Sequence, residues 1–365
     1  MRIAFFEASP HWSGGAKRIY LLAKNLLTMG HQPVVCCLAG SLLSHKFSSL
    51  GGEVEIITPN FDPDIFAFLR IIKIIKKHKI TLLDLCSPKF YWIGCFAGIL
   101  LKKKVIITRT VPFRKKGLKK LINRFLYNNL ADIVIAVSEN VRRDLIKDFS
   151  LSEDKVKTIT FGIDLKEFSV YEKTNILEKE YGIRGNPIIG IVTRLDENKG
   201  LENLIFSVPL VVKEFPDVKF IIAGTGKKLK ELLELVEKLN LKNYVFFIGF
   251  REDIPKILTE VDITMIPSPK EALPTIAMES MAVGKPVVSV DSGGIRELIQ
   301  DGYNGVICSS FSSESIADGI IKLLKSDYKK IGSAARETIE KKFTIDVSVS
   351  RYISVCNELL DENKI

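Results

Sequence analysis

The sequence predicts an α/β protein made of two domains, each a parallel sheet covered by helices on both faces. A chain of 365 residues is long enough for two domains of ordinary size. The composition, 46% apolar and 26% charged, is that of a globular protein. Short apolar runs alternate with amphipathic stretches almost throughout, which is the pattern of parallel strands joined by crossover helices.

Seven apolar runs predict the strands of the first domain: residues 2–8, 32–38, 54–58, 80–86, 105–108, 133–137 and 156–160. Helical patterns lie between most of them, for example at residues 16–29, 66–77 and 119–130. The uncharged run at residues 90–101 is too short to span a bilayer, so we expect it to form a buried helix.

The second half repeats this scheme, with strands expected at residues 188–193, 219–223, 244–248, 263–267, 286–290 and 305–307. The charged, aperiodic segment 161–187 predicts the interdomain linker. We therefore expect domains at residues 1–165 and 166–343, and a C-terminal helix at 344–365 that packs back on the first domain. Ligands of doubly wound sheets bind beyond the carboxyl ends of the strands.

Cysteines and termini indicate a cytoplasmic protein. The six cysteines show neither a CxxC pair nor the Cys/His spacing of a metal site, which favours reduced thiols. Met1 leads directly into an apolar run that reads as a strand, so we expect no signal peptide.

Two loops after strands of the second half carry residues suited to phosphate. Arg194 and Lys199 lie in RLDENKG, where two cations beside a helix N-terminus suit a diphosphate, although each could be a solvated charge. Gly224 and Gly226 lie in AGTGKK, a weak phosphate-loop signal that could equally be a turn. Phe250 and Arg251 follow the next strand and its Gly249, where a nucleotide base could lie against exposed backbone.

Two glutamates flank the start of an apolar helix in SPKEALPTIAMES. Glu271 lies in the loop before the helix that Pro274 introduces, and Glu279 lies more than one turn inside it. At roughly 1.5 Å per residue, the two carboxylates can stand on the order of 10 Å apart. Between them, the N–H groups of Thr275 and Ile276 can bind a phosphate. We interpret this set as a clamp for a nucleotide sugar, whereas either glutamate alone would indicate a dipole or ion-pair role.

Taken together, these motifs resemble the retaining glycosyltransferases of family 4 (glycosyl transferases group 1), whose GT-B fold has two doubly wound Rossmann-like domains facing a central cleft. The resemblance covers most of the chain. It is carried by SGGAKRIYLLAKNLLTMGH, AVSENVRRDL, ITFGIDLKEF, GIVTRLDENKG, IIAGTGKK, FFIGFREDI and IPSPKEALPTIAMESMAVGKPVVSVDSGGIRELIQDGYNGVI. The last segment is the most specific, because it combines the two-glutamate spacing with the PVV strand and the SGG turn.

The resemblance implies an acceptor-binding first domain and a nucleotide-sugar-binding second domain. It implies that Arg194 and Lys199 hold the diphosphate, that Glu271 contacts the donor sugar and that Glu279 contacts the ribose. The remaining donor contacts that we expect are Gly14, Gly15, Gly224, Gly226, Phe250, Arg251, Leu273, Pro274, Thr275 and Ile276. Gly14 and Gly15 would let the first loop approach the diphosphate.

The acceptor side departs from the family pattern. Many relatives have a histidine after the fifth strand, where this chain has Arg109 in TRTVPF. Arg109 and His11 are our candidate acceptor contacts, although His11 could equally be a loop hydrogen-bonder.

The expected activity is transfer of a hexose-type sugar from a nucleotide diphosphate sugar to a lipid-linked or saccharide acceptor, in polysaccharide or glycolipid assembly. The alternatives are a nucleotide-sugar epimerase of GT-B architecture and a non-catalytic sugar-nucleotide-binding protein.

We expect neither a metal nor a cofactor. The string Asp62-Pro-Asp64 matches the DxD of metal-dependent transferases, but it precedes a helical pattern, where aspartate is an expected cap. The sequence suggests no other cluster of metal ligands.

The positive charge is concentrated in the first half of the chain. Residues 1–165 hold 26 Lys and Arg against 13 Asp and Glu, a net charge of +13. The basic stretch 102–129 could be a solvated face, a nucleic-acid site or a surface that docks on anionic lipid. It contains no nucleic-acid module, and a lipid-linked acceptor favours lipid docking. We therefore expect a cytoplasmic protein, peripheral on the inner face of the plasma membrane.

Overall fold

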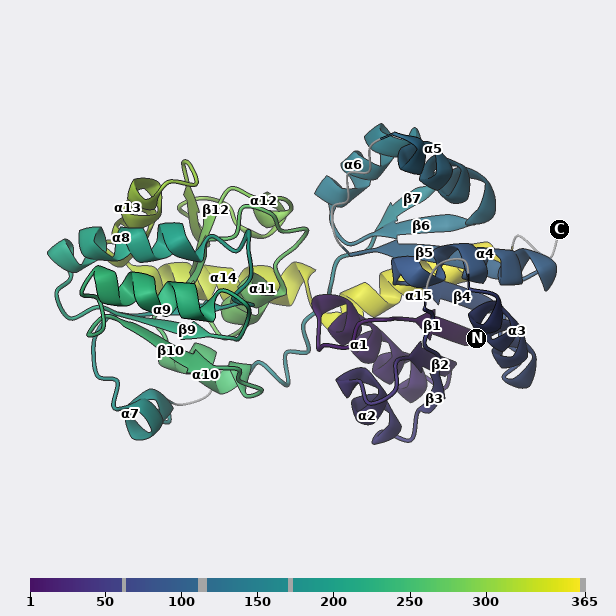
Figure 1. Ribbon diagram of the computed structural model, residues 1–365, viewed down its shortest axis with the longest axis horizontal. Coiled ribbons are helices and arrows are strands. Elements are labelled where there is room, and N and C mark those ends of the chain that lie inside the picture. Colours follow the sequence, from purple (N-terminus) through teal and green to yellow (C-terminus); the bar gives the residue numbers. More distant parts are fainter. Residues whose placement is uncertain (61–63, 111–116, 170–172, 362–365) are drawn as a thin grey trace. The chain divides into compact units, whose positions relative to one another are not determined.

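A computed structural model describes residues 1–60, 64–110, 117–169 and 173–361 (Figure 1). The chain forms two compact units, each built on its own parallel sheet. Unit 1 comprises Met1–Gly162 and Ile345–Ile365, and unit 2 comprises Ile163–Thr344. The chain therefore passes from one unit to the other twice.

Unit 1 contains a seven-stranded parallel sheet in the order β3-β2-β1-β4-β5-β6-β7. All seven strands predicted for the first half are confirmed. Their bounds are Arg2–Phe6 (β1), Gln32–Cys37 (β2), Glu53–Ile56 (β3), Leu82–Leu85 (β4), Lys104–Arg109 (β5), Ile133–Ala136 (β6) and Val156–Thr158 (β7). The central strands are apolar on both sides because helices cover both faces of the sheet.

Two layers of helices cover this sheet. One layer holds α1 (Gly14–Thr28), α2 (Leu42–Ser48) and α15 (Ile345–Asp361), and α1 contacts both of the others. The second layer holds α3 (Ile65–Lys77), α4 (Tyr91–Leu100), α5 (Leu118–Phe125) with the π-helical turn η2 (Leu126–Leu130), and α6 (Glu139–Phe149). A 3₁₀ turn, η1 (Pro88–Phe90), precedes α4. The strand order reverses between β1 and β4, so right-handed crossovers place the later helices on the opposite face.

The C-terminal helix α15 belongs to unit 1, and Figure 1 shows it, in yellow, among the elements of the first half. Its Tyr352 ring lies 5.8 Å from the ring of Phe5 in β1. The Ser348 hydroxyl donates to the Thr160 carbonyl at 2.8 Å. The end of the chain thus completes the hydrophobic core of the first sheet.

The apolar run 90–101 forms a helix, α4, but our prediction that it is buried is wrong for one face. On its inner face, a Cβ added to Gly94 would lie only 2.4 Å from Leu85 of β4, so the helix packs very closely on the sheet. On its outer face, Phe96, Ile99 and Leu100 are exposed. An uncharged helix thus has the same one-sided burial as an amphipathic one.

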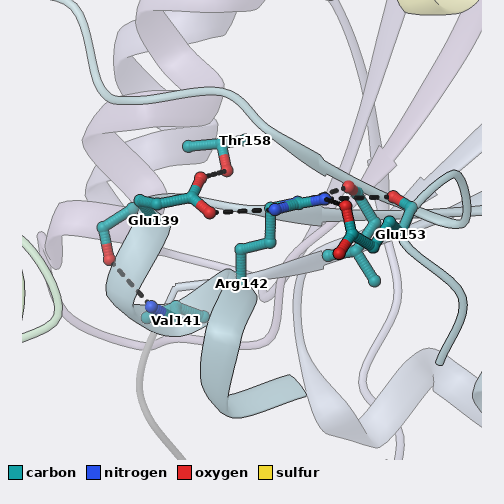
Figure 2. Close-up of polar contacts among 7 residues, drawn as sticks. Glu139, Val141, Arg142, Glu153 and Thr158 are labelled. Carbon is teal, nitrogen blue, oxygen red and sulfur yellow. Dashed lines mark hydrogen bonds and ion pairs between the residues drawn. The ribbon is translucent and has the colours of Figure 1, made fainter. Parts of the chain in front are cut away.

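Motif AVSENVRRDL contains the start of α6 and holds it on β7 (Figure 2). The Ser138 hydroxyl caps the helix by accepting the Val141 N–H at 3.2 Å. Glu139 accepts a hydrogen bond from Arg142 at 2.9 Å and one from the Thr158 hydroxyl at 2.8 Å (Figure 2). This part of the family resemblance therefore reflects a structural network.

Unit 2 contains a six-stranded parallel sheet in the order β10-β9-β8-β11-β12-β13. All six predicted strands are confirmed, as Ile188–Val192 (β8), Lys219–Ala223 (β9), Val245–Gly249 (β10), Ile263–Ile266 (β11), Val287–Val290 (β12) and Gly305–Cys308 (β13). The helices are α7 (Ile176–Tyr181), α8 (Leu201–Glu214), α9 (Leu229–Lys238), α10 (Ile254–Glu260), α11 (Thr275–Ala282), α12 (Ile295–Leu298), α13 (Ser313–Leu324) and α14 (Tyr328–Lys342).

The segment expected to be the linker, residues 161–187, is mostly part of unit 2. It contains α7, which packs on α10. Leu177 and Ile183 from this segment are buried with Ile221 and Ile248 in a hydrophobic cluster. Helix α7 is only six residues long, and its charged residues Glu178, Lys179 and Glu180 are exposed, which masked its helical pattern in the sequence.

Candidate active site

The candidate site of unit 2 lies where the strand order reverses. From β8 the chain continues through β9 and β10 on one side of the sheet, and then returns to β11 on the other side of β8. Strands β8 and β11 pair directly, with Ile189 opposite Ile263. Their carboxyl ends therefore bring two loops together, and this reversal is the usual ligand position in a doubly wound sheet.

Lys199 and Glu271 meet at this reversal. The Lys199 ammonium lies 2.7 Å from the Glu271 carboxylate, although 72 residues separate them in the chain. Each side chain is 21% exposed, so the pair is mostly buried but still accessible to a ligand. The ammonium has three donors and the carboxylate has a second oxygen, so both can also bind a ligand that carries phosphate and hydroxyl groups.

The loop that carries Lys199 packs closely against the end of β11. Gly200, the N-cap residue of α8, has φ +72°, and a Cβ there would lie 2.1 Å from the Pro267 carbonyl oxygen. Nearby, the Ser268 hydroxyl donates to the Asn198 carbonyl at 3.4 Å. Only glycine fits this close approach, which holds Lys199 beside the loop that carries Glu271.

The Glu271 loop is held by the SGG turn, Ser292 to Gly294, that follows β12. The Gly294 N–H donates to the Ala272 carbonyl at 2.9 Å. Gly293 has φ +52°, and a Cβ there would lie 1.5 Å from the Glu271 carbonyl oxygen. The turn therefore sets the position of the Glu271 backbone, which explains the glycine at position 293.

Helix α11 presents its N-terminus beside this loop and buries Glu279. Pro274 is the N-cap residue, and Thr275 and Ile276 are the first two helical residues. Leu273 is buried. Glu279 is only 7% exposed, so its side chain is held in one place inside the unit.

Arg194 does not join the Lys199–Glu271 pair in this structure. Its side chain is 70% exposed and pairs with Asp196 at 2.8 Å. An exposed pair of this kind is worth only ~0–1 kcal/mol, so an anionic ligand can replace Asp196 at little cost.

Gly224 and Gly226 pack the loop after β9 against the loop after β8. A Cβ at Gly224 would lie 1.9 Å from the Thr193 carbonyl oxygen, and one at Gly226 would lie 2.3 Å from that of Leu195. The close packing of the two loops therefore explains both glycines. A direct contact of either glycine with the donor stays a prediction.

Phe250 and Arg251 differ in how available their side chains are to a ligand. Phe250 is exposed and free to stack on a ring. Arg251 forms two hydrogen bonds of 2.8 Å with Asp253 and also contacts Glu180 and the Tyr181 hydroxyl of α7. These hydrogen bonds raise the pKa of the Arg251 guanidinium. Arg251 thus anchors α7, a role that the sequence did not indicate.

Sequence reasoning missed Glu7, which lies at the corresponding reversal of unit 1. Glu7 directly follows β1, beside the start of α1 at Gly14, and a Cβ at Gly15 would lie 3.2 Å from its Oε2. The side chain is buried and accepts the Ser9 N–H at 2.9 Å. Burial, assisted by the Asp84 carboxylate, raises the pKa of Glu7 to about 7. The only signal in the sequence is a carboxylate at the end of the first apolar strand.

Replacing Glu7 by glutamine is expected to change how stability depends on pH. Above the ordinary carboxyl pKa of 4.5 the unfolded state releases the Glu7 proton, whereas the folded state keeps most of it until the pH approaches 7, so the contribution of Glu7 to stability falls as pH rises. The Glu7→Gln variant lacks this term and should gain about 2 kcal/mol relative to wild type between pH 5 and 8. Urea unfolding of both proteins at the two pH values measures the difference, and parallel pH profiles would contradict it.

The two candidate acceptor contacts lie in different settings. His11 is exposed, and its carbonyl accepts the Ser9 hydroxyl at 3.0 Å and the Ser13 N–H at 2.8 Å. Arg109 ends β5 and is buried, with its guanidinium 6.0 Å from the centre of the Tyr91 ring. A contact of either residue with an acceptor stays a prediction.

Asp64 acts as a helix cap. It is the N-cap of α3, and its carboxylate accepts the N–H groups of Phe66 and Ala67 at 2.9 and 3.1 Å. A hydrogen bond from the Asn60 N–H at 3.0 Å, together with those from Ala67 and Phe66, lowers the pKa of Asp64. Asp62 lies outside the described residues. Within the described ranges, no group of three or more His, Cys, Asp or Glu could hold a metal ion.

The fold and the site define an α/β protein with two doubly wound units, one of which holds an ion pair at its strand-order reversal. Two family models match nearly the whole chain: Glycosyltransferase Family 4 at residues 12–167 and Glycosyl transferases group 1 at residues 173–338. The chain belongs to glycosyltransferase family 4 and has the GT-B type of architecture. Helices that could cross a membrane are absent from the described part of the chain.

Known proteins agree with this assignment. The chain is 28% identical to N-acetyl-α-D-glucosaminyl L-malate synthase of Bacillus anthracis over 237 residues, which are 64% of this chain and 61% of that protein. It is 28% identical to a Campylobacter jejuni enzyme, N-acetylgalactosamine-N,N'-diacetylbacillosaminyl-diphospho-undecaprenol 4-α-N-acetylgalactosaminyltransferase, over 86% of this chain and 88% of the enzyme. Anabaena HepE, solved with UDP and glucose, superposes with a TM-score of 0.88 at 22% identity, covering 98% of this chain and all of HepE.

Proposed function

We propose that the protein is a retaining glycosyltransferase that moves a hexose-type sugar from a nucleotide diphosphate sugar to a lipid-linked or saccharide acceptor. The observation that carries this proposal is the Lys199–Glu271 pair at the strand-order reversal of unit 2. A cation and a carboxylate side by side suit the junction of a donor, where a diphosphate joins a sugar that carries hydroxyl groups.

Each residue of the site has a role in this proposal. When the bond from the sugar to the diphosphate breaks, negative charge grows on the leaving phosphate, and Lys199, Arg194 and the N-terminus of α11 stabilise it. Glu271 accepts hydrogen bonds from the donor sugar and Glu279 from the ribose. The acceptor hydroxyl attacks the donor sugar on the same face from which the diphosphate departs, so no enzyme nucleophile is required. We propose that these cations neutralise the diphosphate without a bound metal.

The comparisons support a nucleotide-sugar donor and leave two classes of acceptor. HepE was solved with UDP and glucose, and the name of the Campylobacter relative specifies an acceptor linked to diphospho-undecaprenol. We extend both features to this chain as a proposal. A lipid-linked acceptor also agrees with our expectation that the basic stretch 102–129 meets an anionic membrane at its cytoplasmic face. Residues 111–116 of that stretch lie outside the described residues.

Incubation with a panel of UDP- and GDP-hexoses, with and without a chelator, tests the proposed activity. We expect one donor to release its nucleoside diphosphate faster when a saccharide or polyprenyl diphosphate acceptor is added, and a chelator to leave that rate unchanged. An epimerase would change the donor sugar without any acceptor. Nucleotide binding without turnover of any donor would indicate a non-catalytic protein, and either result would contradict the proposal.

A further inference from the structure

The strand-order reversal of unit 1 holds the side chain of Glu7. From β1 the chain continues through β2 and β3 on one side of the sheet, and then returns to β4 on the other side of β1. Glu7 directly follows β1, and its N–H donates to the Cys36 carbonyl of β2 at 3.0 Å, so its place at the carboxyl edge of the sheet is fixed. Ligands of doubly wound sheets bind at such a reversal. None of the donor contacts proposed for unit 2 involves it.

Glu7 is a buried carboxyl group without a cationic partner. Its neighbour Asp84 of β4 lies 3.8 Å from the Arg18 guanidinium and accepts the Thr108 hydroxyl at 2.7 Å. Glu7 forms no ion pair with any described residue, and its hydrogen bonds come from adjacent backbone N–H groups such as that of Ser9. Burying a carboxyl group costs free energy unless the group is paired, so a carboxyl in this state is a candidate for binding a ligand.

Three chain segments meet beside the Glu7 carboxyl at a residue that has no side chain. That residue is Gly15, in the first turn of α1, where a Cβ would lie 3.2 Å from Glu7 Oε2. The same Cβ would lie 3.7 Å from the Ser13 hydroxyl oxygen and 3.7 Å from the methyl carbon of Thr110, which follows β5. Glu7 keeps 7% of its surface exposed, so the carboxyl is not sealed from solvent.

The charge around Glu7 favours a hydroxyl group as its ligand and disfavours an anion. A carboxylate accepts hydrogen bonds from hydroxyl groups and repels phosphates and carboxylates. The Asp84 carboxylate adds to this repulsion, since it raises the pKa of Glu7 in addition to the effect of burial. In the proposed function the donor diphosphate is bound by cations of unit 2, Lys199 and Arg194. A neutral sugar hydroxyl is therefore the group that fits Glu7.

We propose that Glu7 binds the acceptor hydroxyl that receives the sugar, and that it selects a neutral saccharide at this position over a small acidic acceptor. The inference rests on the proposed function and narrows it, because it names the chemical class of the acceptor at its reacting end. A hydrogen bond to an ionised group is about twice as strong as one between neutral groups, so it can fix the hydroxyl oxygen in place. Any diphosphate of a lipid-linked acceptor must then lie away from this carboxylate.

Saturation-transfer NMR with the full chain tests the proposal without requiring turnover. The probes are D-glucose, D-galactose, N-acetyl-D-glucosamine and L-malate, each added in the presence of UDP. We expect at least one sugar to bind and L-malate not to bind. We also expect Glu7→Ala to weaken sugar binding by about tenfold or more, because a hydrogen bond to a charged group is lost. Binding of L-malate alone, binding of no probe, or equal sugar binding by Glu7→Ala would overturn the proposal.

The pH dependence of sugar binding separates a ligand contact from a structural role. The folded state keeps most of the Glu7 proton until the pH approaches 7, so wild-type affinity should rise from about pH 6 to about pH 8 as the carboxylate forms. Glu7→Gln should bind more weakly at the higher pH and show no such rise. The charged and titratable groups around Glu7 are Asp84, Arg18, Cys37, Cys86 and His11. All of them are unchanged in Glu7→Gln, so a rise that persists in this variant would come from one of them and contradict the proposal.

A matched control comes from a second buried carboxylate. Glu260 is 4% exposed and accepts the Thr174 N–H at 2.6 Å, but it lies before the amino end of β11. Glu260→Gln should bind the sugar as wild type does, and circular dichroism checks that every variant is folded. Sugar binding that depends on Glu7 in a protein without turnover would contradict the proposed function alone. Turnover with an acceptor KM that Glu7→Gln leaves unchanged would contradict this inference alone.

Discussion

Replacing Lys199 by alanine is expected to lower turnover at saturating donor by roughly a hundredfold or more, while nucleoside affinity changes little. The reason is the position of its ammonium, 2.7 Å from the Glu271 carboxylate, at the place where we expect the charge of the leaving diphosphate to grow. A group that acts on charge developed in the transition state lowers the barrier more than it strengthens ground-state binding. Steady-state kinetics and calorimetric titration with the nucleoside measure the two effects separately.

Two further variants make this test specific. Lys325→Ala removes another lysine that pairs with a carboxylate at 2.7 Å, on Glu214, and it should leave turnover unchanged. Glu279→Ala should have the opposite signature and weaken nucleoside binding by about 1–3 kcal/mol through lost ribose hydrogen bonds. If Lys199→Ala weakens nucleoside binding and leaves turnover intact, Lys199 does not stabilise the leaving group.

Gly293→Ala is expected to abolish most activity although Gly293 carries no side chain. The new Cβ would lie 1.5 Å from the Glu271 carbonyl oxygen, so the loop that carries Glu271 must move. Displacement of a catalytic group by about 1 Å can cost on the order of a hundredfold in rate. The residue also has φ +52°, which alanine adopts only with strain, so we expect the melting temperature to fall as well. Activity assays and thermal unfolding measure both effects.

Gly302→Ala separates strain from displacement. Gly302 has φ +77°, so it carries similar backbone strain, but an added Cβ would meet no heavy atom within 4 Å. We expect this variant to lose some stability and to keep its activity. If Gly293→Ala retains wild-type activity, the SGG turn does not position Glu271. If both variants lose activity equally, backbone strain alone explains the loss.

The sequence by itself determined the strands of both sheets and the strand ends that carry the site. All thirteen predicted strands are present because β-strands in a doubly wound sheet are short apolar runs, a pattern within a few residues of chain. Strand ends locate the loops, so Lys199 and Glu271 could be assigned to loops at the carboxyl edge before their contact was known.

The tertiary structure alone decided which of these groups meet. The contact between Lys199 and Glu271 depends on the pairing of β8 with β11, which joins segments 72 residues apart. Burial depends on neighbours in the same way. Glu7 is buried because α1 begins beside it, and α4 exposes one face because nothing in the described part of unit 1 covers it. Local patterns record the preferences of single elements, whereas contacts, burial and pKa arise only when distant elements pack together.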